Sequence, residues 1–230
     1  MKTAAKLLLF DLDGTLILSG GAGFEAWRRL FKKFHGIEDA MRCVDGRGKT
    51  DPNILKEAFL VNLKREPTTA ESKEFFTAYE RMLKSIVRTS EGYRMIEGIE
   101  GLLKALCRRE GVYLALGTGN VEAGARIKLS RARLNRFFPV GGFADDSSHR
   151  PTLLRKAACQ AARHYKTTFK GGVYVIGDTP LDVSAGKSCG FVTAVIDSGV
   201  VAREELVASK PDHLFDSYKH PQEWIERLGL

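Results

Sequence analysis

The chain has 230 residues, of which 43% are hydrophobic and 28% charged, a composition typical of a globular protein that buries a core. No apolar run approaches the ~20 residues of a membrane-spanning helix. The apolar segment at residues 7–10 is too short for a secretory signal. We therefore expect a cytoplasmic protein with no membrane partner.

The basic balance of the chain favours anionic partners, because a formal charge of +8 raises their concentration near the surface. A nucleic-acid binder and an enzyme for phosphorylated anions both fit this charge. The basic residues are scattered over helix-like segments such as 27–34 and form no continuous arm. We therefore expect a merely basic surface and no nucleic-acid partner. The four cysteines form no C-x-x-C pair and predict neither a disulfide nor a metal site.

Apolar patterning divides the chain into two parts. Residues 6–10 predict a buried strand, whereas apolar residues recur at helical spacing from about residue 19 to residue 91. Three helices are expected in this stretch, the second with Asp51 as N-cap and Pro52 as its first residue. Further along the chain, strand and helix patterns alternate. The expected strands there are 112–116, 141–143, 173–176, 191–196 and 213–215, and the expected helices are 102–109, 122–134, 151–165 and 181–189.

This alternation predicts an α/β fold, with a Rossmann-like, doubly wound parallel sheet covered by helices on both faces. Residues 1–18 and 92–230 would form this core, and residues 19–91 an inserted α-helical cap domain. The glycine-rich segment 19–23 is the expected hinge between the two.

Two carboxylates, Asp11 and Asp13, leave the end of the first predicted strand on the same side. Like charges this close repel each other unless a cation lies between them, and Mg²⁺ prefers such oxygen ligands. An Asx-type turn at the strand end explains the same pattern. Ligand sites of open α/β sheets form outside the carboxyl ends of strands, and Asp11 and Asp13 stand at such a position.

Polar residues also follow the second and third predicted core strands. Thr118, between two glycines and ahead of a helix, can offer a hydroxyl and backbone N–H groups to a phosphate, although it could equally cap that helix. Arg150 stands at a helix start, where a cation is unfavourable unless a carboxylate or phosphate lies nearby. A solvated surface arginine is the alternative interpretation.

The strand at 173–176 ends in Gly-Asp-Thr-Pro-Leu-Asp. Thr179 and Pro180 fit an N-cap and a first helical residue, so Asp182 falls where an acidic side chain completes a capping box. Asp178 has no comparably simple structural explanation.

Taken in this order and at these strand ends, the four motifs resemble the haloacid dehalogenase superfamily of hydrolases. The specific likeness is to its phosphatases with a helical (C1-type) cap, such as phosphoglycolate phosphatases. It covers nearly the whole chain, and FDLDGT at 10–15 and GDTPLD at 177–182 are its most specific motifs.

The resemblance implies a role for each carboxylate. Asp11 would be the nucleophile that forms an aspartyl-phosphate, and Asp13 the general acid. Asp11, the backbone carbonyl of Asp13, and Asp178 would hold one Mg²⁺, because the family's strand order puts the first and fourth core strands side by side. Asp182 would orient the basic residue or a metal-bound water.

The remaining motif residues would bind the phosphoryl group. Thr118 and the amides around Gly119 and Asn120 would hold it. Arg150 stands where the family usually has a lysine, often followed by proline, and arginine keeps the charge and can bind phosphate in a bidentate fashion. Lys156 is a weaker substitute further into the helix.

The loop before the second cap helix resembles the specificity segment of phosphoglycolate-type phosphatases. Arg47 and Lys49, which alternate with glycines there, are therefore expected substrate contacts. An exposed loop between two helices explains them equally well.

The function implied by the resemblance is a Mg²⁺-dependent phosphatase acting on a small phosphorylated metabolite. A dehalogenase is disfavoured, because Asp13 and Asp178 would be superfluous to it. Two alternatives stay open: a sugar-phosphate mutase of the same superfamily, and a basic nucleic-acid- or protein-binding module on the same fold. The sequence does not predict an oligomeric state.

Overall fold

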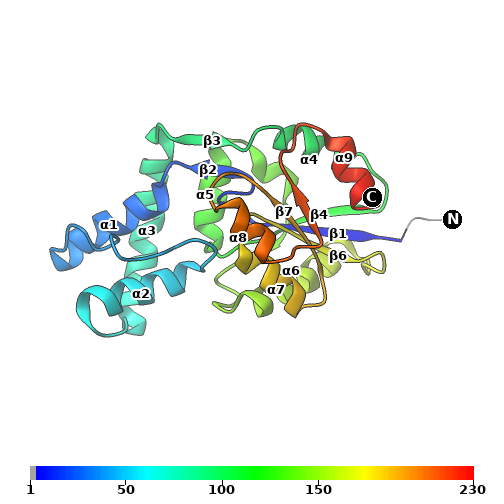
Figure 1. The fold of residues 1–230 in the computed structure, drawn as a ribbon. Coiled ribbons are helices and arrows are strands. Elements are labelled where there is room, and N and C mark those ends of the chain that lie inside the picture. The colour runs from blue at the N-terminus through cyan, green and yellow to red at the C-terminus, as the bar shows by residue number, and fades with distance from the viewer. Residues whose placement is uncertain (1–3) are drawn as a thin grey trace.

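The structure is a computed structural model that describes residues 4–230, so residues 1–3 of the predicted core lie outside the described part. It contains a six-stranded sheet in the order β5-β4-β1-β6-β7-β8, with every neighbouring pair parallel (Figure 1). The strands are β1 (Lys6–Phe10), β4 (Val112–Gly117), β5 (Gly141–Gly142), β6 (Val173–Gly177), β7 (Val192–Ile196) and β8 (His213–Phe215).

Helices cover both faces of the sheet. They are α4 (Ile99–Cys107), α5 (Glu122–Arg131), α6 (Arg150–Tyr165), α7 (Pro180–Ser188), α8 (Arg203–Ala208) and α9 (Pro221–Arg227). Side chains of β1 alternate between the faces: Leu7 and Leu9 pack with α6 and α7, whereas Leu8 and Phe10 pack with α4, α5 and α9. Because β1 is buried on both sides, it is a continuous apolar run. The predicted doubly wound α/β fold is confirmed.

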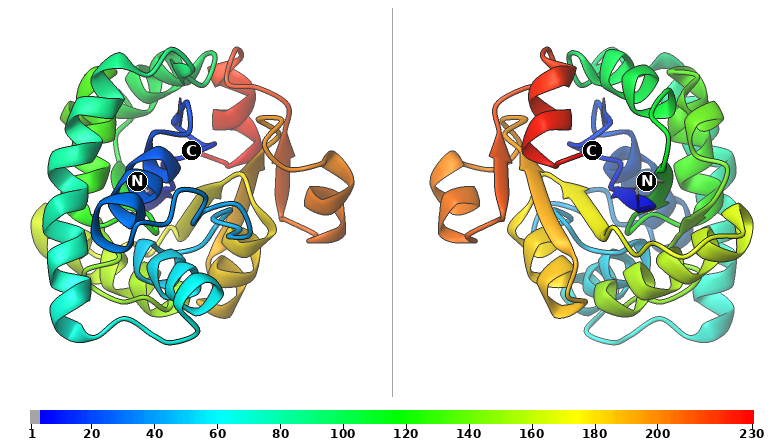
Figure 2. Two further views of the ribbon diagram at one scale, coloured as in Figure 1. Left: turned by 90° about the vertical axis from the view of Figure 1, so that its left-hand side faces the viewer. Right: turned by 90° about the vertical axis from the view of Figure 1, so that its right-hand side faces the viewer.

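The segment between β1 and β4 contributes three further helices, α1 (Ala22–His35), α2 (Asp51–Leu63) and α3 (Thr69–Thr89), which gather beside the sheet (Figure 1). They share an apolar cluster with an aromatic centre formed by Trp27, Phe31, Phe59, Phe75 and Tyr79. Figure 2 shows α3 on one side of the molecule and α8 with β8 on the opposite side. The division into a core and a cap at residues 18 and 92 stays a prediction.

Two short strands, β2 (Ile17–Ser19) and β3 (Tyr93–Met95), pair antiparallel where the chain leaves for α1 and returns from α3. Sequence patterns did not predict these two strands. A Cβ at Gly20, which has a φ of 65°, would meet the backbone of Gly92. The two connecting segments therefore lie in close contact at the predicted hinge.

Several helix starts differ from the predictions: α4, for example, begins at Ile99 and not at residue 102. The N-cap of α2 is Thr50, and Asp51 is its first helical residue. The prediction of Asp51 as N-cap was wrong because its carboxylate accepts a hydrogen bond from the core, at Val121 N (2.8 Å). Helix α6 begins at Arg150, which puts Pro151 second. Within the described residues, no helix has the length and apolar character that a membrane crossing requires.

Candidate active site

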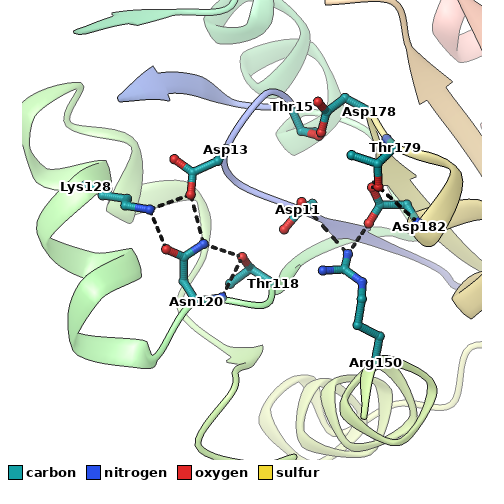
Figure 3. A network of polar contacts seen from close by, with 10 residues as sticks. All are labelled: Asp11, Asp13, Thr15, Thr118, Asn120, Lys128, Arg150, Asp178, Thr179 and Asp182. Atoms are coloured by element: carbon teal, nitrogen blue, oxygen red, sulfur yellow. Dashed lines mark hydrogen bonds and ion pairs between the residues drawn. The ribbon is translucent and has the colours of Figure 1, made fainter. Parts of the chain in front are cut away.

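The candidate site lies at the carboxyl edge of the sheet, where the loops after β1, β4 and β6 meet the start of α6 (Figure 3). The parallel register aligns Phe10 with Leu116 and Ile176, so the residues that follow these strands leave the sheet together. A cavity of about 500 Å³ opens there, lined by these loops and by segments of α1, α2 and α3. This volume is typical of small-molecule sites.

Three buried aspartates form the acidic part of the site. Carboxylate oxygens of Asp11, Asp178 and Asp182 lie within 4.8 Å of one another. The Asp178 carboxylate accepts a hydrogen bond from Thr15 Oγ1 (3.1 Å) through Oδ1, whereas its buried Oδ2 has no partner among the described residues. A Cβ at Gly14 would overlap this carboxylate, so only glycine leaves room for it.

The acidic groups resist ionisation in this arrangement. Burial raises the pKa of Asp11 to about 7, the Asp182 charge adds to the increase, and Arg150 opposes it. Burial, with the charges of Asp182 and Asp11, also raises the pKa of Asp178 well above its usual value. A divalent cation would offset both effects. The donor set, oxygen only and with one buried oxygen unpartnered, fits a hard ion such as Mg²⁺.

Arg150 is the cation of this acidic part. Its guanidinium donates to Asp182 Oδ1 and lies 3.9 Å from Asp11 Oδ2, and its side chain is only 10% exposed. Two carboxylates thus offset the unfavourable position of a cation at a helix start. Asp182 also completes the predicted capping box of α7 with Thr179, which is confirmed. Lys156 instead donates to the carbonyl of Asp146 (2.5 Å).

The turn after β4 forms the second part of the site. Thr118 Oγ1 accepts hydrogen bonds from the backbone N (3.3 Å) and Nδ2 (3.0 Å) of Asn120. The same Nδ2 reaches Asp13 Oδ2 (3.0 Å). Thr118, Gly119 and Asn120 are all buried, and the last two line the cavity. The predicted phosphate-binding turn therefore contacts the predicted general acid.

Lys128, on α5, is a site residue that the sequence analysis missed. The residue is 4% exposed, and its ammonium donates to Asp13 Oδ2 (2.5 Å) and Asn120 Oδ1 (2.6 Å). A lysine inside a basic helix resembles a surface residue. The available signal was its place on the same helical face as Ala125 and Leu129, which are buried.

Asp51 was also missed as a site residue. Its backbone N donates to Gly119 O (2.7 Å), while its carboxylate accepts from Val121 N. Burial raises its pKa to about 6, and the nearby Lys128 charge opposes this. The start of α2 is thereby tied to the turn after β4.

The two predicted substrate cations of the cap loop line the cavity but pair with acids of their own segment. Arg47 contacts Asp45 (3.0 Å), and Lys49 contacts Glu57 (2.5 Å). A Cβ at Gly48 would meet Thr179 Oγ1 at 2.8 Å, so the loop lies directly against the core. The structure thus places both cations at the cavity.

An α/β fold with a buried carboxylate cluster that can hold a metal ion, and a polar turn beside it at the carboxyl edge of the sheet, is typical of enzymes that act on phosphoryl groups. The model of the haloacid dehalogenase-like hydrolase family matches residues 5–190, and the chain belongs to that family.

Known relatives and structures extend over nearly the whole chain. Pyrophosphatase PpaX of Halalkalibacterium halodurans is 25% identical over 222 residues, which cover 91% of this chain and 92% of that protein. Phosphoglycolate phosphatase of Pseudomonas syringae pv. syringae is 25% identical over 224 residues, 93% of this chain and 77% of that protein. The structure of CbbY from Rhodobacter sphaeroides in complex with phosphate is similar with a TM-score of 0.73 and 20% identity, covering 99% of this chain and 100% of that one. The family match and the relatives' names confirm the predicted family and the predicted enzyme class, a phosphatase.

Proposed function

We propose that this protein is a Mg²⁺-dependent phosphatase that hydrolyses a small phosphorylated metabolite through an aspartyl-phosphate on Asp11. The observation that carries the proposal is the position of Asp11. It is a buried carboxylate at the end of a central strand, it lines the cavity, and it lies between Arg150 and Asp178. The names of the relatives, a pyrophosphatase and a phosphoglycolate phosphatase, support a small phosphorylated substrate.

The reaction would proceed in two steps. In the first, a carboxylate oxygen of Asp11 attacks phosphorus, the bond from phosphorus to the leaving oxygen breaks, and Asp13 gives that oxygen a proton. In the second, Asp13 takes a proton from water as the water oxygen attacks the aspartyl-phosphate. The bond from phosphorus to Asp11 then breaks, which releases inorganic phosphate and restores the free carboxylate.

The turn after β4 would hold the transferring group. The Thr118 hydroxyl and the amides around Gly119 and Asn120 can donate to its oxygens, and Arg150, whose guanidinium lies beside Gly119, supplies positive charge. Asp182 would keep the guanidinium in place through the contact described above. Arg47 and Lys49 are proposed contacts for the rest of the substrate, at the rim of the cavity.

Asp11, Asp178 and the backbone carbonyl of Asp13 would hold the Mg²⁺ ion. When bound, the ion supplies positive charge that shields the nucleophile from an anionic substrate. Residues 19–91 would act as a cap that closes over the site and excludes water, while residues 1–18 and 92–230 form the catalytic core.

The experiment that tests the proposal is phosphate release from a panel of phosphorylated metabolites, with Mg²⁺ or with EDTA. Wild-type protein is expected to release phosphate only with metal. Asp11→Asn, which keeps the size of the side chain, is expected to lower release by at least ~10⁴-fold, because nucleophile removal abolishes covalent catalysis. Phosphate release by folded Asp11→Asn at the wild-type rate would contradict the proposal.

The same panel separates a phosphatase from the mutase alternative. Both begin by phosphorylating Asp11, but a mutase returns the group to a second hydroxyl. Isomerised sugar phosphate without free phosphate would therefore favour the mutase, whereas free phosphate favours the phosphatase.

A further inference from the structure

Lys128 is a buried cation that the two proposed steps do not use. A buried ammonium is costly unless charges and hydrogen bonds compensate for it. Two oxygens do so here, Asp13 Oδ2 and Asn120 Oδ1, each within 2.6 Å of Nζ. Lys128 lies within helix α5 and not in a loop.

The contacts of Lys128 close a ring of three side chains (Figure 3). Lys128 donates to Asp13 and to Asn120, and Asn120 in turn donates from Nδ2 to the same Asp13 oxygen. Asn120 is also bonded to Thr118 Oγ1 in the proposed phosphate-binding turn. The ring thus fixes the Asp13 carboxylate relative to the residues that would hold the phosphoryl group.

The two oxygens of Asp13 have different surroundings. Oδ2 accepts from both Lys128 and Asn120, whereas Oδ1 is buried and has no partner among residues 4–230. The carboxylate is therefore held in place through Oδ2 alone. Such restraint matters because proton transfer requires the donor within hydrogen-bond reach of the reacting oxygen.

We propose that Lys128 is a positioning residue that holds Asp13 for proton transfer to the leaving group. The inference rests on the proposed function of Asp11 and Asp13, and it assigns Lys128 no contact with the reacting atoms. Removing the ammonium would leave Asp13 tethered only by Asn120. The rate of the first step should then fall most where the leaving oxygen needs a proton.

The test compares leaving groups in single turnovers, with Mg²⁺ present and enzyme in excess. One substrate is 4-nitrophenyl phosphate, whose nitrophenolate leaves readily without a proton. The other is glycerol phosphate, whose alcohol needs a proton to leave. Lys128→Met is expected to slow alcohol release from glycerol phosphate by about 10- to 100-fold, a part of the 10²–10⁴-fold that general acids contribute. First-turnover release of nitrophenol is expected to change less than threefold, which also shows that the variant is folded.

A double variant tests whether Lys128 acts through Asp13. Adding Lys128→Met to Asp13→Asn is expected to cause no further slowing with glycerol phosphate, since the acid is already lost. Lys104→Met is the matched control: it removes an exposed ammonium that pairs with Glu100, and it should behave as wild type.

Two results would overturn the inference. One is equal slowing of both substrates by Lys128→Met, and the other is additive slowing in the double variant. Failure of the proposed function is distinguishable, because Asp11→Asn would then still release nitrophenol in the first turnover.

Discussion

Asp51 illustrates how a single buried carboxylate joins two segments that are far apart in the sequence. Through one backbone and one side-chain hydrogen bond it ties the start of α2 to the turn at Gly119 and Val121. Its side chain forms no ion pair of its own among the described residues, so its charge is incompletely compensated. Burial therefore makes ionised Asp51 a cost to stability.

The pH dependence of stability should reveal this cost. The folded protein binds the Asp51 proton more strongly (pKa about 6) than the unfolded chain (pKa 3.8), so this group's contribution falls as pH rises from about 4 to 6 and is constant above. Asp51→Asn keeps an acceptor for Val121 N and removes the titration. We therefore compare the free energy of unfolding in urea between Asp51→Asn and wild type. The difference should be more favourable to the variant by about 1–3 kcal/mol at pH 8 than at pH 4. An identical difference at both pH values would contradict this account.

Single residues were predictable where local pattern and strand ends coincide. Asp11, Asp178 and Thr118 were predicted as site residues because each follows an apolar run that predicts a strand, either directly or after one glycine. Lys128 and Asp51 were not found, because their contacts join positions 115 and 70 residues apart and leave no local pattern. Long-range pairing of this kind requires the tertiary structure.

At the scale of elements, two helices carry the same capping device with different consequences. Thr68 caps α3 and Thr179 caps α7, each with an acidic residue three positions later that closes the box. Asp182, in the second box, also contacts Arg150, whereas Glu71 in the first pairs with Arg65 on the exposed surface.

These two caps form a matched pair of substitutions. Thr68→Ala and Thr179→Ala should each lower the free energy of unfolding by about 1 kcal/mol. Only Thr179→Ala should also slow catalysis, by about 3- to 30-fold, because Asp182 loses two of the bonds that orient it toward Arg150. Equal activity in the two variants would show that the Asp182 position does not depend on its cap.

Elements were predictable where the residues show a clear pattern. Residues 6–10 form a continuous apolar run, and α1 and α3 show apolar residues at helical spacing. The strands β2 and β3 show neither pattern, and they pair where the chain returns beside itself. The predicted helix 122–134 ends earlier, at Arg131, and Arg133 adopts a left-handed φ of 57° that an α-helix cannot continue.

At the scale of the molecule, parallel topology gathers distant residues at one edge. Loops at positions 11, 118 and 178 meet there because β4, β1 and β6 are neighbours in the sheet. Helices α1 to α3 lie over the same edge and contribute to the cavity. The carboxyl end of the sheet is where ligands bind in such folds, and here it carries the carboxylates.

The central claim is a covalent bond between Asp11 and the phosphoryl group, and trapping it is the most direct test. Wild-type protein would be mixed with a ³²P-labelled substrate and Mg²⁺, quenched in acid within one turnover, and digested. We expect label on the peptide that contains Asp11, released by hydroxylamine as an acyl-phosphate should be, and absent from Asp11→Asn. Substrate turnover without labelled protein, or label on another peptide, would contradict the account.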